Sequence, residues 1–145
     1  MRGGLHHIEL WVPDLTRAID SIGWLLTALG YAPHQDWGEG RSWRLGDTYI
    51  VVEHSPALTE DVHDRCRPGL NHLAFSVGDV SQLDELIADA TDHGWTLLFP
   101  DRHPHAGGPD HYAGYLENSD GFEVELVADY DETSRARAPA DRPSV

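Results

Sequence analysis

One phrase of the sequence occurs twice, 65 residues apart, and this repeat constrains the fold more than any other feature. Residues 4–15 read GLHHIELWVPDL and residues 69–80 read GLNHLAFSVGDV. Each copy is a strand-like run followed by a turn and a helical pattern, and each carries a histidine at the same position, His7 and His72. Since neither unit can close a core alone, we expect the two to pack together as one domain.

Both halves show the same order of strand, helix, strand, strand, strand. In the first half, alternation over 5–12 predicts a strand, apolar spacing over 15–29 predicts a helix, and three short strands fit 31–54. In the second half the same order occupies 70–77, 80–93, 95–99, 111–117 and 122–128. The sequence therefore predicts an α+β fold built from two βαβββ repeats.

The predicted boundaries follow from composition. The single domain covers 1–128, with a first unit at 4–54 and a second at 69–128. Two prolines and several charges mark 55–68 as the linker. Residues 129–145 lack apolar periodicity, and we expect them to form a flexible C-terminal tail.

The charge balance excludes several classes of partner. The chain has 25 acidic residues against 10 basic ones, all arginine, and a formal net charge of −15. Such a chain is poorly suited to nucleic acid or anionic membranes, and no apolar run approaches the roughly 20 residues of a membrane span. The single cysteine, Cys66, excludes an intramolecular disulfide, and we expect a reducing, cytoplasmic setting.

Two histidines and two glutamates lie at related positions of the two halves. His7 and His72 lie on the non-core faces of the first strands, and Glu53 and Glu125 lie near the ends of the last strands. The two glutamates are 72 residues apart, which fits the repeat if a loop at 100–109 is an insertion. A lone strand histidine is more often a core residue, but four such residues predict one divalent ion per site. A nitrogen and oxygen ligand set favours Zn, Ni, Co, Mn or Fe(II).

Other side chains share a face or a loop with these candidate ligands and are predicted to bind a small-molecule substrate. Those on strands are Glu9, Trp11, Tyr49 and Ser76, with Trp37 and Trp43 on the middle strands of the first half. The loop at 103–112, rich in histidine and glycine, is predicted to be a lid that contributes His105, His111 and Tyr112. The alternatives are ordinary sheet packing for the tryptophans and a solvated loop with chance histidines.

These motifs resemble the vicinal oxygen chelate superfamily, which includes glyoxalase I, fosfomycin-resistance thioltransferases, methylmalonyl-CoA epimerase, extradiol dioxygenases and bleomycin-resistance proteins. The resemblance covers 4–128 and rests on HIELWVPDL at 7–15, HLAFSVGD at 72–79 and NSDGFEVEL at 118–126, where the family has Asp-Pro for Asn-Ser. It implies a cupped mixed sheet around a central cavity. It also implies a divalent ion held by His7, His72 and Glu125 and, as in glyoxalase, by Glu53.

Three functions are compatible with these residues. The first is a glyoxalase-like lyase or isomerase acting on a small oxygenated substrate. In this enzyme the divalent ion would polarise a carbonyl and stabilise an enolate, while Glu53 or Glu125 would take the α-proton. A bleomycin-resistance-like binding protein without catalysis would generally lack the ligands. An Fe(II) extradiol-type dioxygenase needs a free coordination face, which Glu53 would partly occupy. A homodimer is expected, because small two-unit relatives often place their sites at the dimer interface.

Overall fold

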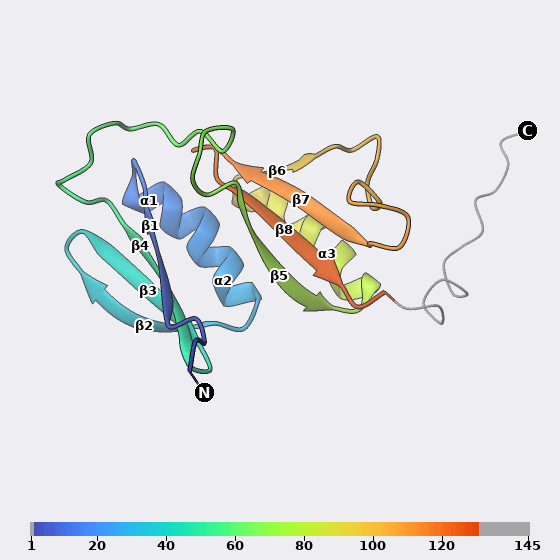
Figure 1. The fold of residues 1–145 in the computed structure, drawn as a ribbon, viewed down its shortest axis with the longest axis horizontal. Helices are drawn as coiled ribbons and strands as arrows, with labels where there is room; N and C mark the ends of the chain where they lie inside the picture. Colours follow the sequence, from blue (N-terminus) through green and yellow to red (C-terminus); the bar gives the residue numbers. More distant parts are fainter. Residues whose placement is uncertain (1, 131–145) are drawn as a thin grey trace, which may run out of the picture.

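The chain folds into two βαβββ modules (Figure 1), seen in a computed structural model that describes residues 2–130. Of the predicted tail, residues 131–145 lie outside the described part of the chain. The first module consists of β1 (His7–Trp11), α1 (Leu15–Ala18), a π-helical turn (Ile19–Gly23), α2 (Trp24–Ala28), β2 (Ala32–Trp37), β3 (Gly40–Leu45) and β4 (Thr48–Glu53). The second consists of β5 (His72–Gly78), α3 (Val80–Ala90), a 3₁₀ turn (Thr91–His93), β6 (Trp95–Leu98), β7 (Ala113–Asn118) and β8 (Glu123–Ala128).

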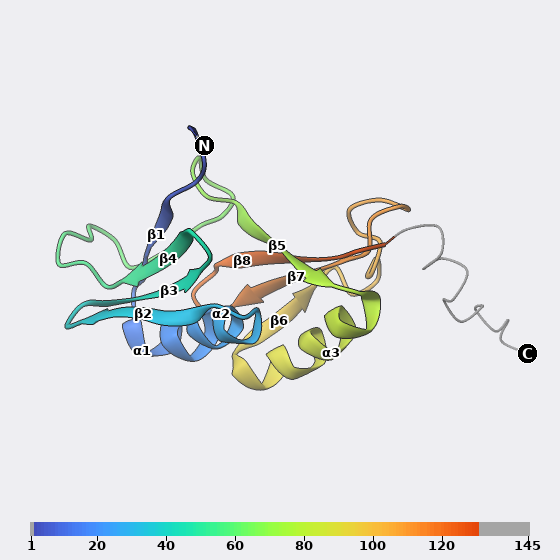
Figure 2. The same ribbon diagram turned by 90° about the horizontal axis from the view of Figure 1, so that it is seen from below.

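The predicted α+β fold with two βαβββ units is confirmed, with two mixed sheets ordered β1-β4-β3-β2 and β5-β8-β7-β6. In each sheet the first and last strands of the module are parallel neighbours, and the remaining pairs are antiparallel. The two sheets are separate hydrogen-bonded units within this chain. The helices of both modules lie on the same side of the sheets (Figure 2), so each sheet has one face without helices, called here its open face.

Local capping fixes where the helices begin and end. Asp14 accepts a hydrogen bond from the backbone of Arg17 at 2.8 Å at the start of α1. Asp79 and Gln82 form a reciprocal capping box at the start of α3, as a short polar side chain followed by Gln three residues later predicts. Gly94, with a φ of 80°, ends the second helical segment. None of the helices within residues 2–130 has the length and apolar character needed to cross a membrane.

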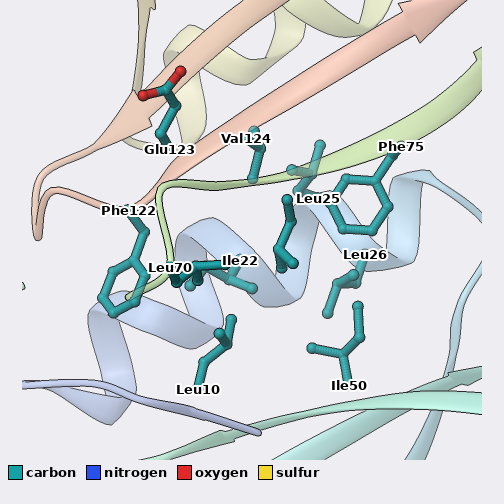
Figure 3. A pocket seen from close by; sticks show the side chains of 11 residues that line it. Leu10, Ile22, Leu25, Leu26, Ile50, Leu70, Phe75, Phe122, Glu123 and Val124 are labelled. Carbon is teal, nitrogen blue, oxygen red and sulfur yellow. The ribbon is translucent and has the colours of Figure 1, made fainter. Parts of the chain in front are cut away.

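The two modules meet through an apolar junction (Figure 3). Leu10, Ile22, Leu25 and Ile50 of the first module face residues of the second, namely Leu70, Phe75, Phe122 and Val124. The cavity left between them is about 10 Å³, which holds about one water molecule. The junction is therefore part of the core and cannot accommodate a substrate.

Polar contacts around the π-helical turn also join the modules. The Trp95 indole donates to the backbone carbonyl of Ser21 at 3.1 Å, and the Asn118 amide donates to the Ser21 hydroxyl at 3.2 Å. The rings of Trp24 and His93 stack at 4.1 Å between centroids. The two hydrogen bonds to Ser21 are buried, so their loss would leave unpaired polar groups inside the protein.

Candidate metal centre

The second module brings one predicted histidine and glutamate pair together on the open face of its sheet. In the register of β5 and β8, His72 is opposite Glu123 and Ala74 is opposite Glu125. Glu125 is therefore two residues beyond the partner of His72, and a two-residue step keeps a side chain on the same face. His72 Nε2 and Glu125 Oε2 are 3.2 Å apart.

Asn71 fixes the orientation and the tautomer of His72. The Asn71 amide nitrogen donates to the backbone carbonyl of Arg65 at 3.0 Å, which leaves its oxygen as the acceptor toward His72 Nδ1 at 2.7 Å. His72 Nδ1 therefore carries the hydrogen, and in the neutral ring Nε2 presents a lone pair to Glu125. An imidazole whose second nitrogen donates to an acceptor is the usual arrangement of a metal-binding histidine.

The other carboxylate oxygen of Glu125 is held by two donors. The Tyr115 hydroxyl donates to Oε1 at 2.7 Å, and His111 Nε2 donates to the same atom at 2.6 Å. Burial would raise the pKa of Glu125, but the hydrogen bonds from His111 and Tyr115 outweigh it and lower the pKa below its usual value. Burial, together with the bond to Glu125, raises the pKa of Tyr115 to about 12, so it stays a donor at neutral pH.

The loop that precedes β7 packs closely against this pair of donors. A Cβ at Gly107 would lie 2.6 Å from His111 Cδ2 and 2.7 Å from the Tyr115 hydroxyl oxygen, so any side chain there would push the donors from Glu125. Of the predicted loop residues, His111 reaches the site. His105 accompanies Tyr112, with ring centroids 5.6 Å apart, and the Tyr112 hydroxyl donates to Asp84 of α3 at 3.1 Å. Tyr112 is therefore engaged with the helix rather than with Glu125.

The first module treats its histidine differently. His7 is opposite Tyr49 in the register, and the two rings stack with centroids 4.9 Å apart. His7 Nδ1 is 2.9 Å from Nδ1 of His6, the residue that corresponds to Asn71 in the repeat. Both modules therefore hold the histidine through Nδ1 and the residue before it.

The predicted equivalence of Glu53 and Glu125 is wrong by two residues. The position two beyond Tyr49 is Val51, which is buried, and Glu53 is opposite Trp11 instead. A two-residue step along a strand is about 6.6 Å. Glu53 therefore lies farther along the sheet from His7 than Glu125 lies from His72.

Within residues 2–130, no three His, Cys, Asp or Glu side chains come together in an arrangement that could hold a metal ion. His72 and Glu125 are joined, but His7 and Glu53 do not complete the set within one chain. The four predicted ligands therefore lie on two separate sheets and are not brought together within the described residues.

The remaining predicted side chains divide between the open face and the core. Glu9 and Trp11 lie on the open face, where the indole donates to the carboxylate at 2.7 Å. Ser76 is exposed on β5, opposite Val127. Trp43, which is also predicted to bind substrate, is 5% exposed and lies on the helix side of the sheet, where a Cβ at Gly23 would come within 2.6 Å of its ring.

Sequence reasoning missed Tyr115 and Asn71. Tyr115 is opposite Glu125 in the register of β7 and β8, a pairing that could be found only once the hairpin at residues 118–123 had been counted outward from its turn. Asn71 stands inside the repeated phrase, and the polar residue before the histidine in both copies was the available signal.

Comparisons with known proteins agree with this fold. The family model described as Glyoxalase/Bleomycin resistance protein/Dioxygenase superfamily matches residues 6–115. The uncharacterized protein YqjT of Bacillus subtilis (strain 168) is 44% identical over 126 residues, covering 86% of this chain and 98% of that protein. A candidate glyoxalase from Bacillus halodurans, known from its crystal structure, is 41% identical with a TM-score of 0.82, covering 88% of this chain and 96% of that one.

A more distant structure shares the fold. The fosfomycin resistance protein FosX from Listeria monocytogenes, crystallised with Mn(II) and sulfate, has a TM-score of 0.59 and 19% identity, covering 94% of this chain and 100% of that one.

Proposed function

This chain belongs to the Glyoxalase/Bleomycin resistance protein/Dioxygenase superfamily, and on that premise we propose that it is a divalent-metal-dependent lyase or isomerase acting on a small oxygenated substrate. The observation that carries the proposal is the pair His72 and Glu125. A ring nitrogen lone pair and a carboxylate oxygen face each other at 3.2 Å, and the hydrogen of the ring is committed to Asn71. Two acceptors at this distance suit a shared cation.

We propose His72, Glu125 and His7 as the ligands, with His7 supplied by a second copy of the chain. His7 uses Nδ1 toward His6, which leaves Nε2 for an ion. A homodimer that places the open face of the first sheet of one copy against that of the second sheet of the other would bring these ligands together. The presence of Mn(II) in FosX, which has the same fold, supports a divalent ion. The donor set also suits Zn, Ni, Co or Fe(II).

A bound divalent ion would act as a Lewis acid on a carbonyl or a pair of vicinal oxygens of the substrate. Glu125 suits a ligand better than a base, since its second oxygen is occupied by two donors and its pKa is lowered. We assign the proton transfer to His111, whose Nε2 is held by Glu125 while its ring is partly exposed. A histidine oriented by a carboxylate is a common arrangement for a general base.

The position of Glu53 favours a second candidate, an Fe(II) extradiol-type dioxygenase. That reaction uses two histidines and one carboxylate and needs free coordination positions. Because Val51, rather than a glutamate, corresponds to Glu125, the ligand set that we propose leaves those positions free. A purely drug-binding protein, by contrast, would have no need of a histidine that Asn71 orients toward a glutamate.

Metal analysis of protein purified without added metal tests the proposal. We expect metal bound by the wild type and by Glu53→Ala, and its loss from Glu125→Gln, with light scattering reporting a dimer. Loss of metal from Glu53→Ala would instead support the predicted four-ligand site, with Glu53 as a ligand. Retention of full metal in Glu125→Gln, or no binding of added Mn, Zn or Fe(II) by the wild type, would contradict the proposed centre. Turnover of a carbonyl substrate without dioxygen favours the lyase or isomerase, and oxygen consumption with a catechol favours the dioxygenase.

A further inference from the structure

A row of four residues crosses the open face of the first sheet from edge to edge. Trp37 of β2 is opposite Gly40 of β3, Gly40 is opposite Glu53 of β4, and Glu53 is opposite Trp11 of β1. Residues directly opposite one another in neighbouring strands point to the same face. Two indoles and one carboxylate therefore share a single line across the sheet.

The glycine in this row determines where the first indole lies. A Cβ at Gly40 would be 2.6 Å from Trp37 Cε2 and 3.0 Å from Trp37 Nε1, so the ring occupies the space above the glycine. This brings the indole one strand closer to Glu53. Trp11 flanks Glu53 on the other side and is 43% exposed. Strand β4, which carries Glu53, lies between β1, which carries Trp11, and β3, whose Gly40 is covered by the Trp37 ring. The Trp11 indole N–H is bonded to Glu9, so its ring faces remain available.

The negative charge in this row is not neutralised by the protein. Glu53 has no side-chain hydrogen bond or ion pair with any residue in the described range 2–130. The neighbouring Glu9 carboxylate accepts from the Trp11 indole. The two arginines of β3 are committed elsewhere, Arg41 to Asp36 and Arg44 to the carbonyl of Gly46. The formal net charge of −15 on the whole chain adds to the attraction that Glu9 and Glu53 exert on a cation.

We propose that Trp11, Trp37 and Glu53 bind the ammonium head of an organic cation, an alkylated amine on the substrate or on a ligand that shares its cavity. Indole faces attract such cations through the ring quadrupole and contact their methyl groups, and the carboxylate is the counter-charge. An anionic head would be repelled by Glu9 and Glu53. A neutral apolar head would cover Glu53 without compensating its charge. The inference rests on the proposed function only in taking this face as a wall of the substrate cavity.

Isothermal titration calorimetry of the full-length protein with choline tests the site. The protein is used as purified, and its metal content is measured in the same sample. The control ligand is 3,3-dimethyl-1-butanol, which has the same shape without the charge. We expect saturable binding of choline and at least about tenfold weaker binding of the neutral alcohol. Equal affinities for the two ligands would overturn the proposal. So would the absence of binding heat at choline concentrations up to about 50 mM, a range that detects even a weak site.

Variants locate the binding in the row. We expect Glu53→Gln and Trp37→Leu each to weaken choline binding by roughly tenfold. Glu39→Gln, which removes the same charge from the adjacent turn, should leave it unchanged. Gly40→Ala should weaken it as well, since the added methyl displaces the Trp37 ring. If Trp37→Leu does not fold, Glu53→Gln against Glu39→Gln still decides, and equal affinities in that pair would contradict the role of Glu53.

The metal measurement keeps the two proposals separate. Choline binding in protein that holds no metal would support the cation site while the proposed metal centre fails. A metal-loaded protein that binds choline and its neutral isostere equally would overturn the cation site and leave the metal centre standing.

Discussion

The two modules begin from the same phrase and use it for different chemistry. In the second, His72 lies two residues from its glutamate in the register, and Asn71, Tyr115 and His111 hold the pair in place. In the first, the corresponding position is the apolar Val51, and the acidic residue lies one same-face step farther along the strand. A shift of two residues thus separates the pair that we propose as metal ligands from a carboxylate that shares its row of the sheet with two tryptophans.

This difference shows that a repeat in sequence predicts position better than role. Both histidines keep the same hold through Nδ1, one on Asn71 and one on His6. What differs is the neighbouring strand, whose residues decide whether a carboxylate stands beside the ring. Substitutions in each module test this difference.

The largest expected effect separates the two faces of the first sheet. Trp43→Ala should lower the free energy of unfolding by about 3–5 kcal/mol, because it empties a core position beside the π-helical turn. Trp37→Ala, on the open face, should cost about 1 kcal/mol. Urea denaturation followed by circular dichroism measures both. Similar losses in the two variants would mean that Trp37 also belongs to the core.

The next effect concerns the two tyrosines that lie nearest the histidines. Tyr115→Phe removes a donor from Glu125 and should weaken metal affinity by about 10–100-fold. Tyr49→Phe keeps the ring that stacks on His7 and should change the affinity little. Competition with a metal-sensitive dye reports both values. If Tyr49→Phe weakened the affinity as much as Tyr115→Phe, the modules would be more alike than their registers indicate.

A smaller effect tests how firmly the modules are joined. Trp95→Phe removes the hydrogen bond to the Ser21 carbonyl and should cost about 1 kcal/mol, while unfolding stays a single transition. Trp24→Phe keeps an aromatic ring beside His93 and serves as the matched control. Two separate transitions in Trp95→Phe would show that each module is stable by itself.

The last effect appears only at high pH and comes from the ionisation of two tyrosines in the second module. Burial and the neighbouring carboxylates raise the pKa of Tyr112 and of Tyr115 to about 12. Because the folded state keeps these protons while the unfolded state loses them near pH 10, stability should be unaffected by them below pH 10 and should fall between about pH 10 and 12. Absorbance at 295 nm follows the titration. Tyr115→Phe should remove one late-titrating group, and an unchanged late phase would contradict the assignment.

The sequence predicted the elements well because each depends on local signals. The strand alternation before Pro13, the capping residues Asp14 and Asp79, and the glycine after the second helix all act within a few residues. The order of both modules and the positions of His72 and Glu125 follow from these signals. His111 was also predicted as a site residue, and in the structure its Nε2 is hydrogen-bonded to Glu125.

The register between β1 and β4 could not be predicted in the same way. A slip of one residue would bury the wrong face, but a slip of two keeps every apolar side chain inside. The alternation in 48–53 therefore fits either Val51 or Glu53 beside His7. The same limit applies to Trp37 and Trp43, whose opposite faces depend on the turn at Gly38 and Glu39 that joins their strands.

The segment between the modules is attached to the second sheet as well as connecting two parts of the chain. Arg65 pairs with Glu117 at 3.2 Å and with Glu123 at 2.7 Å, and its carbonyl holds the Asn71 amide that orients His72. For the design of fragments, the second module therefore begins before Arg65, inside the linker at 55–68, and not at the repeated phrase. A fragment that begins before Arg65 keeps the support of its own histidine, whereas one that begins at the repeated phrase itself loses it.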